Sequence, residues 1–257
     1  MIIKSSNTIK TTLLLFLSIV GIFSLFFFPP IPQNPTYHQF ADNRTFFNIP
    51  NFWNVISNLP FVLIGVYALI YLKRKKTDGM FSELFINKII FFIGIFFTGI
   101  GSAYYHFNPS NETLLWDRLP MTISFMAFFS IIIGEFISIK TGKILLFPLL
   151  IIGLISVVYW HITEKEGHGD LRSYALVQFL PMILIPLIVL MFPSKFNTNS
   201  FIWLMLSAYL LSKIFEFYDH PVFALGNFIS GHTIKHISAS LAPLIFMRGL
   251  YKRKLKL

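Results

Sequence analysis

Long stretches without a charged residue are the feature that most restricts what this chain can fold into. Segments 12–28 and 201–211 contain none, whereas a soluble domain carries a charged residue at about every fourth position. Across the 257 residues, 55% are hydrophobic and only 12% are charged. A water-soluble fold cannot bury that much apolar surface, so the sequence predicts a protein that uses the lipid bilayer as its solvent.

Eight segments are long enough to cross a bilayer, which takes roughly 20 apolar residues. They are 12–29, 52–72, 88–106, 119–139, 144–161, 173–192, 200–217 and 232–250. Pro29 and Pro30 end the first segment, and no small-x-small cleavage motif precedes them, which favours a retained anchor over a removed signal peptide. We therefore expect an all-α, polytopic transmembrane helix bundle.

The basic residues follow a topology with both termini in the cytoplasm. In that arrangement 15 of the 21 Lys and Arg residues face the cytoplasm, as the positive-inside rule requires. They are Lys4, Lys10, the KRKK run 73–76, Lys88, Lys140, Lys143, Lys195, Arg248, Lys252, Arg253, Lys254 and Lys256. Membrane topology thus accounts for the net charge of +10, and no nucleic-acid partner is expected.

Titratable side chains gather at the opposite, non-cytoplasmic face. All but one of the seven histidines fall there, and His236 lies one turn deeper. Histidines 232 and 236 repeat at i, i+4 on one predicted helix, and His106 ends another. Three histidines and one open position form the usual catalytic zinc site, and a chain without cysteine offers no thiolate ligand.

Two further polar residues stand close to this set. Ser102 is one helical turn before His106, and Asp117 follows in LLWDRLPM. Asp117 has the chemistry to accept a proton from a metal-activated water, and Ser102 to donate to a developing oxyanion. Simpler readings compete: Asp117 as a helix N-cap, and Ser102, beside two glycines, as a small-residue helix contact.

Isolated histidines near helix ends are usually interfacial residues with local partners. We read His38, His161, His168 and His220 in this way. Trp116, Arg118, Tyr174 and the acidic loop 164–170 are candidates for shaping the headgroup end of a lipid site, without an assigned role.

Together these motifs resemble a known family. GIGSAYYHFNPSNETLLWDRLPM is similar to the Ser-x-x-x-His and Asp signature of the alkaline ceramidases, and SGHTIKHISA to their paired histidines. NFWNVISNLP resembles their first core helix. The family belongs to a superfamily of seven-helix membrane hydrolases that includes adiponectin-receptor-like proteins. The resemblance implies a seven-helix ceramidase-like domain over residues 40–257, preceded over residues 1–39 by a cytoplasmic N-terminus and one extra helix.

The resemblance implies an intramembrane zinc amidase that hydrolyses ceramide, or a related N-acyl lipid, to a fatty acid and an amine such as sphingosine. His106, His232 and His236 then fall on the zinc ligands, and Ser102 and Asp117 on the catalytic pair. The membrane would be a bacterial inner membrane or a eukaryotic endomembrane, with the zinc site near its non-cytoplasmic face.

One departure concerns calcium, which the eukaryotic members bind through several carboxylates before the first core helix. The matching stretch here holds Asp42, Asn43, Asn48 and Asn51, and Asn51 stands where that family has a glutamate. Because calcium affinity falls with fewer charged ligands, no tight calcium site is expected.

Two alternatives remain open at the sequence level. A zinc-containing receptor-like or scaffold protein would show no turnover, and a fourth protein ligand such as Asp117 would close its metal site. A transporter or haem-binding electron carrier would use histidines facing each other from separate helices, and one of the i, i+4 pair would be idle.

Overall fold

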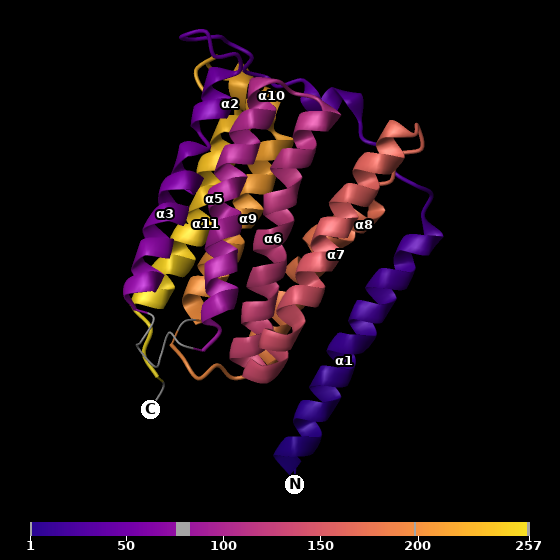
Figure 1. Ribbon diagram of the computed structural model, residues 1–257, viewed down its shortest axis with the longest axis vertical. Helices are drawn as coiled ribbons and strands as arrows, with labels where there is room; N and C mark the ends of the chain where they lie inside the picture. Colours follow the sequence, from indigo (N-terminus) through magenta and orange to yellow (C-terminus); the bar gives the residue numbers. More distant parts are fainter. Residues whose placement is uncertain (1, 76–82, 198, 256–257) are drawn as a thin grey trace.

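The described residues of this computed structural model fold almost entirely into helices (Figure 1). The structure describes residues 2–75, 83–197 and 199–255, so Lys76 and Lys256 of the predicted basic set lie outside it. The helices are α1 (Ile2–Ser24), α2 (Phe52–Ile56), α3 (Leu59–Arg74), α5 (Phe85–Phe107), α6 (Asn111–Phe136), α7 (Ile139–Lys165), α8 (Arg172–Met191), α9 (Asn199–Phe217), α10 (Asp219–Ala224) and α11 (Gly231–Tyr251). The predicted all-α fold class is confirmed.

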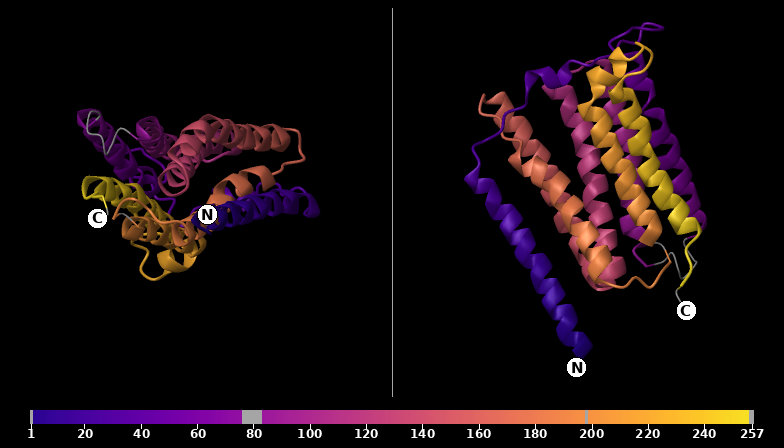
Figure 2. Two further views of the ribbon diagram at one scale, coloured as in Figure 1. Left: turned by 90° about the horizontal axis from the view of Figure 1, so that it is seen from below. Right: turned by 180° about the vertical axis from the view of Figure 1, so that it is seen from behind.

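Among the described residues, seven helical segments are long and apolar enough to cross a membrane, the N-terminal helix among them. The chain is therefore a multi-pass membrane protein. The eighth predicted span corresponds to α11, which has 21 residues but a lower mean hydropathy because it carries the histidine pair, Lys235 and two serines. Packing against α9 and α3 inside the bundle lets α11 hold polar side chains away from lipid (Figure 2).

A cluster of apolar side chains fills the bundle below the level where α5 ends and α11 begins. Phe91 and Phe92 of α5, Phe128 of α6 and Phe246 of α11 are all less than one-tenth exposed, and their ring centroids lie 4.8–6.1 Å apart. Edge-to-face aromatic contacts of this kind add stability beyond the area that they bury. The cluster holds α5, α6 and α11 together and so fixes where their polar ends meet.

Helix α1 is set apart on the flank of the bundle, next to α8 (Figures 1 and 2). It was predicted over 12–29 but spans Ile2–Ser24 and passes into a 3-10 turn at Leu25–Phe27, because Pro29 and Pro30 lack the N–H groups that would continue the helix. Arg172 of α8 donates hydrogen bonds to the carbonyl oxygens of Leu25 and Phe28. The proposed division of the chain at residue 39 remains a prediction.

The first core helix is broken where the sequence predicted one continuous span over 52–72. The structure divides it into α2 and α3 at Ser57 and Asn58. Pro60, at the start of α3, has no N–H for the carbonyl of Ile56 and its ring crowds that carbonyl. This break turns Ser57 and Asn58 toward the interior, where both are buried.

Candidate metal centre

Three buried histidines meet where α5 ends and α11 begins. His106 is 1% exposed, His232 5% and His236 3%. The Nε2 atom of His106 lies 3.1 Å from Nε2 of His236 and 3.3 Å from Nε2 of His232. Among the described residues these three form the only His, Cys, Asp or Glu group whose donor atoms converge closely enough to hold a metal ion.

The spacing of these nitrogens fits a tetrahedral metal. A Zn–N bond of about 2.0–2.1 Å places two ligand nitrogens about 3.3–3.4 Å apart in a tetrahedron. The two Nε2 separations that His106 makes come close to that spacing. Three uncharged imidazoles in a dry environment form a donor set that suits zinc well.

The far side of His236 is held by the break between α2 and α3. Its Nδ1 lies 2.7 Å from the Ser57 hydroxyl and 3.4 Å from the Asn58 amide nitrogen. With Nδ1 protonated, His236 donates to the Ser57 hydroxyl, which in turn donates its hydrogen to the Asn54 carbonyl. That tautomer leaves the lone pair on Nε2, the atom that faces the other two histidines.

The start of α11 is fixed by Asp219, the first residue of α10. Its Oδ1 accepts a hydrogen bond of 2.7 Å from the backbone N–H of His232, and its Oδ2 accepts one of 2.9 Å from the N–H of Ala41. The carboxylate thus accepts a hydrogen bond from an otherwise unpaired N–H in the first turn of α11. Its negative charge also interacts favourably with the positive end of the α11 helix dipole. Asp219 therefore positions His232 through the backbone.

Ser102 and Asp117 are brought together by a close approach of α5 to α6. Ser102 and Asp117 line the same cavity, with the Ser102 hydroxyl near the Asp117 carboxylate, and both residues are buried. A Cβ atom on Gly101 would lie 2.0 Å from the carbonyl oxygen of Trp116, so only glycine permits this approach. The sequence analysis also allowed Ser102 to be part of a small-residue contact between helices. The structure has such a contact at Gly101, and this packing places Ser102 against Asp117.

Helix α6 begins at Asn111, earlier than the predicted span over 119–139, and this changes the setting of Asp117. Ser110 is the N-cap and forms a capping box with Thr113. Asp117 lies inside the helix, about two turns after the cap. The N-cap reading of Asp117 is therefore wrong, because Ser110 already satisfies the free N–H groups of that end.

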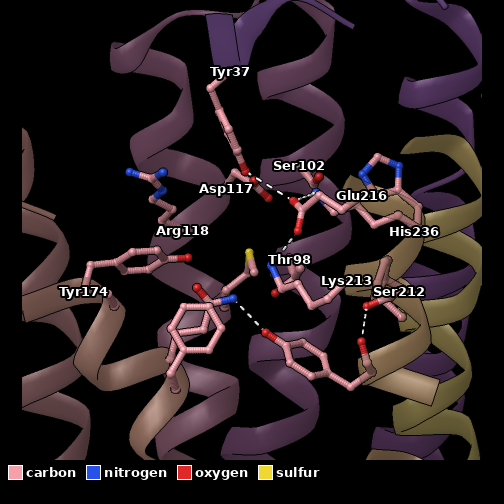
Figure 3. Close-up of a pocket in the computed structure, with 18 of the residues that line it drawn as sticks. Tyr37, Thr98, Ser102, Asp117, Arg118, Tyr174, Ser212, Lys213, Glu216 and His236 are labelled. Atoms are coloured by element: carbon pink, nitrogen blue, oxygen red, sulfur yellow. Dashed lines mark hydrogen bonds and ion pairs between the residues drawn. The ribbon is translucent and has the colours of Figure 1, made fainter. Parts of the chain in front are cut away.

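Ser102, Asp117 and His236 line one cavity of about 250 Å³ (Figure 3). A buried ion-pair cluster borders it. Glu216 accepts a hydrogen bond of 2.7 Å from Lys213 and one of 2.6 Å from Lys235. An apolar chamber of about 110 Å³ adjoins this cavity and shares part of its wall. The residues shared by both are Phe61, Thr98, Met121, Gln178, Tyr209 and Ala239.

The other candidate histidines lie outside this centre. His38 contacts the Tyr105 hydroxyl and the Asn111 side chain, and His168 lies 3.3 Å from the exposed Glu166 carboxylate. His161 and His220 do not belong to the metal-binding group either. His38 and His168 thus have the local partners that the sequence reading expected, whereas Nδ1 of His161 is buried without a hydrogen-bond partner among the described residues.

Of the residues considered for the headgroup end, two line the cavity and the others do not. Arg118 and Tyr174 border it, whereas Trp116 is 56% exposed. In the acidic loop, Glu164 accepts from the N–H of Gln33 and Asp170 forms an ion pair with Arg172. The loop therefore anchors the segment that follows α1.

The stretch compared with a calcium site is engaged in other contacts. Both oxygens of Asp42 bind Arg44, at 2.8 and 2.7 Å. The Asn51 amide nitrogen donates a hydrogen bond of 2.9 Å to the carbonyl oxygen of His106. Asn51 thereby holds the end of α5, and weak or absent calcium binding remains a prediction.

Several residues around the centre were not predicted to act there. Ser57 and Asn58 support His236, and Lys213, Glu216 and Lys235 border the cavity. The sequence does carry a signal for the last three. Charged residues inside predicted membrane spans require partners, and Lys213 and Glu216 are three residues apart on one helix face.

A family model described as Ceramidase matches residues 44–218. The match contains Ser102, His106 and Asp117, and it ends before His232 and His236. No curated protein matches the chain.

Proposed function

Because the chain belongs to the ceramidase family, we propose that it is an intramembrane zinc-dependent amidase. It hydrolyses ceramide or a related N-acyl lipid to a fatty acid and an amine such as sphingosine. The observation that carries the proposal is the convergence of three buried histidines, one of which, His236, lines the same cavity as Ser102 and Asp117, next to an apolar chamber.

His106, His232 and His236 would hold the zinc ion. Three protein ligands leave one position for water or substrate, which is the arrangement of catalytic rather than structural zinc. Asp117, which would have to close a structural site, is not a member of the converging group. Instead it lines the cavity together with Ser102. This arrangement favours catalysis over the receptor-like or scaffold alternative.

When bound, zinc polarises the amide carbonyl and brings the pKa of a water molecule to about 7. Asp117 accepts the proton of the attacking water and returns it to the nitrogen of the leaving amine. Ser102 donates a hydrogen bond to the oxyanion that develops on the carbonyl oxygen. Burial of both residues excludes bulk water and strengthens these interactions.

The acyl chain of the substrate would occupy the apolar chamber, and its headgroup the polar cavity above. Phe91, Phe125 and Phe128 line the chamber with ring faces and edges that suit methylene groups. The substrate would enter from the bilayer, with the centre near the non-cytoplasmic face. The haem alternative fits less well, because all three histidines point to one place and none of the i, i+4 pair is idle.

The test combines metal analysis with turnover of a ceramide in detergent micelles. Wild-type protein should contain one zinc per chain and release fatty acid. Asp117→Ala should retain zinc and lose turnover, and His106→Ala should lose both. His161→Ala serves as the matched control, because this histidine lies outside the converging group.

Zinc retained by all variants without turnover of any lipid amide in the wild type would favour the scaffold alternative. A visible haem absorption band would favour the electron carrier. Full zinc content and amidase activity in His106→Ala would refute the assignment of the centre.

A further inference from the structure

Arg118 is a buried cation at the edge of the cavity, one residue after Asp117. It is 5% exposed and lines the same space as Ser102 and Asp117 (Figure 3). Its guanidinium carbon lies 4.1 Å from the ring centroid of Trp160 and 4.7 Å from that of Tyr174. Its Nη2 atom donates a hydrogen bond of 2.7 Å to Oε1 of Gln33. Aromatic faces and one amide thus hold the group in a fixed orientation.

This guanidinium has no anionic partner within the described part of the chain. Its Nη1 atom is buried without a hydrogen-bond partner, and no described carboxylate lies within ion-pair distance of it. A buried cation is costly unless it is paired and its donors are satisfied. Stacking on aromatic rings offsets only part of that cost. The fold therefore keeps a rigid donor fork available beside the cavity.

The other charged side chains around the cavity also leave an excess of positive charge. Lys213 and Lys235 share the single carboxylate of Glu216, and Asp117 is the other carboxylate in the lining. Three cations thus border the space with two carboxylates, and the zinc of the proposed function would make it still more positive. A cavity of this charge attracts an anionic group.

We propose that Arg118 is the main contact of a subsite for an anionic group on the substrate. The preferred substrate is an N-acyl lipid that carries a carboxylate or phosphate on the amine side, a few bonds from the amide. Arginine binds either group through two parallel hydrogen bonds. This inference rests on the proposed function, because it names the substrate class of the same centre.

The direction of the substrate follows from the two adjoining spaces. Arg118 lines the polar cavity and not the apolar chamber, which takes the acyl chain. The anionic group therefore belongs to the part of the molecule that leaves as the amine. Water adds across the C–N bond: the acyl carbon gains hydroxyl, the nitrogen gains hydrogen, and the anion remains on the released amine.

A pair of substrates that differ only in charge tests the subsite. Full-length zinc-loaded protein should cleave N-dodecanoylglycine with a kcat/KM about tenfold or more above that for N-dodecanoylglycinamide, the factor expected of one hydrogen bond to a charged group. Arg118→Gln should bring the ratio close to one. Arg248→Gln, which removes an exposed cation at the other end of α11, should leave the ratio as in the wild type. Cleavage of N-dodecanoyl phosphoethanolamine, compared with that of N-dodecanoylglycine, shows whether the subsite prefers phosphate or carboxylate.

A binding measurement separates this inference from the amidase proposal. N-dodecanoylglycine should raise the melting temperature of metal-free wild-type protein more than its glycinamide counterpart, and this difference should vanish in Arg118→Gln. Failure to cleave any lipid amide, with the binding difference intact, would refute the amidase and leave the subsite standing. Equal turnover and equal binding of the two compounds by the wild type would overturn the subsite, even if Arg118→Gln fails to fold.

Discussion

Gly101 offers a direct test of how the helix packing creates the Ser102–Asp117 pair. In Gly101→Ala the added Cβ would meet the carbonyl oxygen of Trp116 at 2.0 Å, whereas ordinary contact begins at 3.4 Å. Backbone cannot rotate away as a side chain does, so α5 and α6 must part by about 1.4 Å at this point. Ser102 and Asp117, which follow these two positions directly, must part with them.

Two magnitudes follow from this displacement. Overpacking costs about 1–3 kcal/mol, of which the better helix propensity of alanine returns about 1 kcal/mol. A misplacement of about 1 Å near reacting groups costs about 100-fold in rate. We therefore expect a moderate loss of stability and a loss of turnover near two orders of magnitude.

The assay compares fatty acid release, zinc content and thermal unfolding of purified Gly101→Ala with those of the wild type. Gly21→Ala is the matched control, because it is also a glycine-to-alanine change within a helix. Its Cβ would meet only the end of the flexible Leu180 side chain, at 3.1 Å. Turnover of Gly101→Ala within about twofold of the wild type would refute the claim that this close approach sets the pair.

Three further outcomes are expected. Ser57→Ala removes the 2.7 Å contact to Nδ1 of His236 and should weaken zinc affinity about 10- to 100-fold in a chelator competition, and an unchanged affinity would contradict its supporting role. Glu216→Gln leaves its two lysines without a counter-ion and should destabilise the protein by about 3 kcal/mol in urea unfolding, whereas wild-type stability would show that the cluster contributes little. The ion pair with Arg172 lowers the pKa of Asp170, so the stability that Asp170 adds is complete above the unfolded pKa of about 3.9 and is lost as pH falls through the lower folded value. The difference in melting temperature between wild type and Asp170→Asn should accordingly shrink only below about pH 4, and shrinkage near neutral pH would speak against the pairing.

The helices and the three histidines were predictable because each depends on local pattern. Charge-free apolar runs mark the spans, and the i, i+4 repeat of His232 and His236 sets two ligands on one face. The third ligand, His106, was predicted from topology, which puts the end of its helix and the start of α11 at the same membrane face, whereas its distance to α11 depends on how helices far apart in sequence pack. That packing is not encoded in any single periodicity.

The supporting residues were harder to predict for the same reason. Pro60 signals a break in the first core span, but a helix in lipid often tolerates proline, so the sequence alone did not place Ser57 beside His236. Arg118 was noted near the headgroup end, yet its lack of a carboxylate partner among the described residues appears only once the surrounding helices are in place. The start of α6 was misjudged because the cap, Ser110, lies in a polar stretch that a hydropathy pattern ignores.

The two halves of the metal centre are made at very different times during synthesis. His106 lies on α5, and its partner His232 follows 126 residues later in the chain. A growing chain that has already inserted α5 therefore offers one imidazole, which binds zinc weakly, until α11 has been made and has packed against it. Metal capture then ties the early and late parts of the bundle together, because the ion binds the assembled fold and not the separate helices. In the proposed enzyme, zinc loading would thus be a check on complete assembly, and a chain that stalls before α11 would lack two of the three histidines that the metal needs.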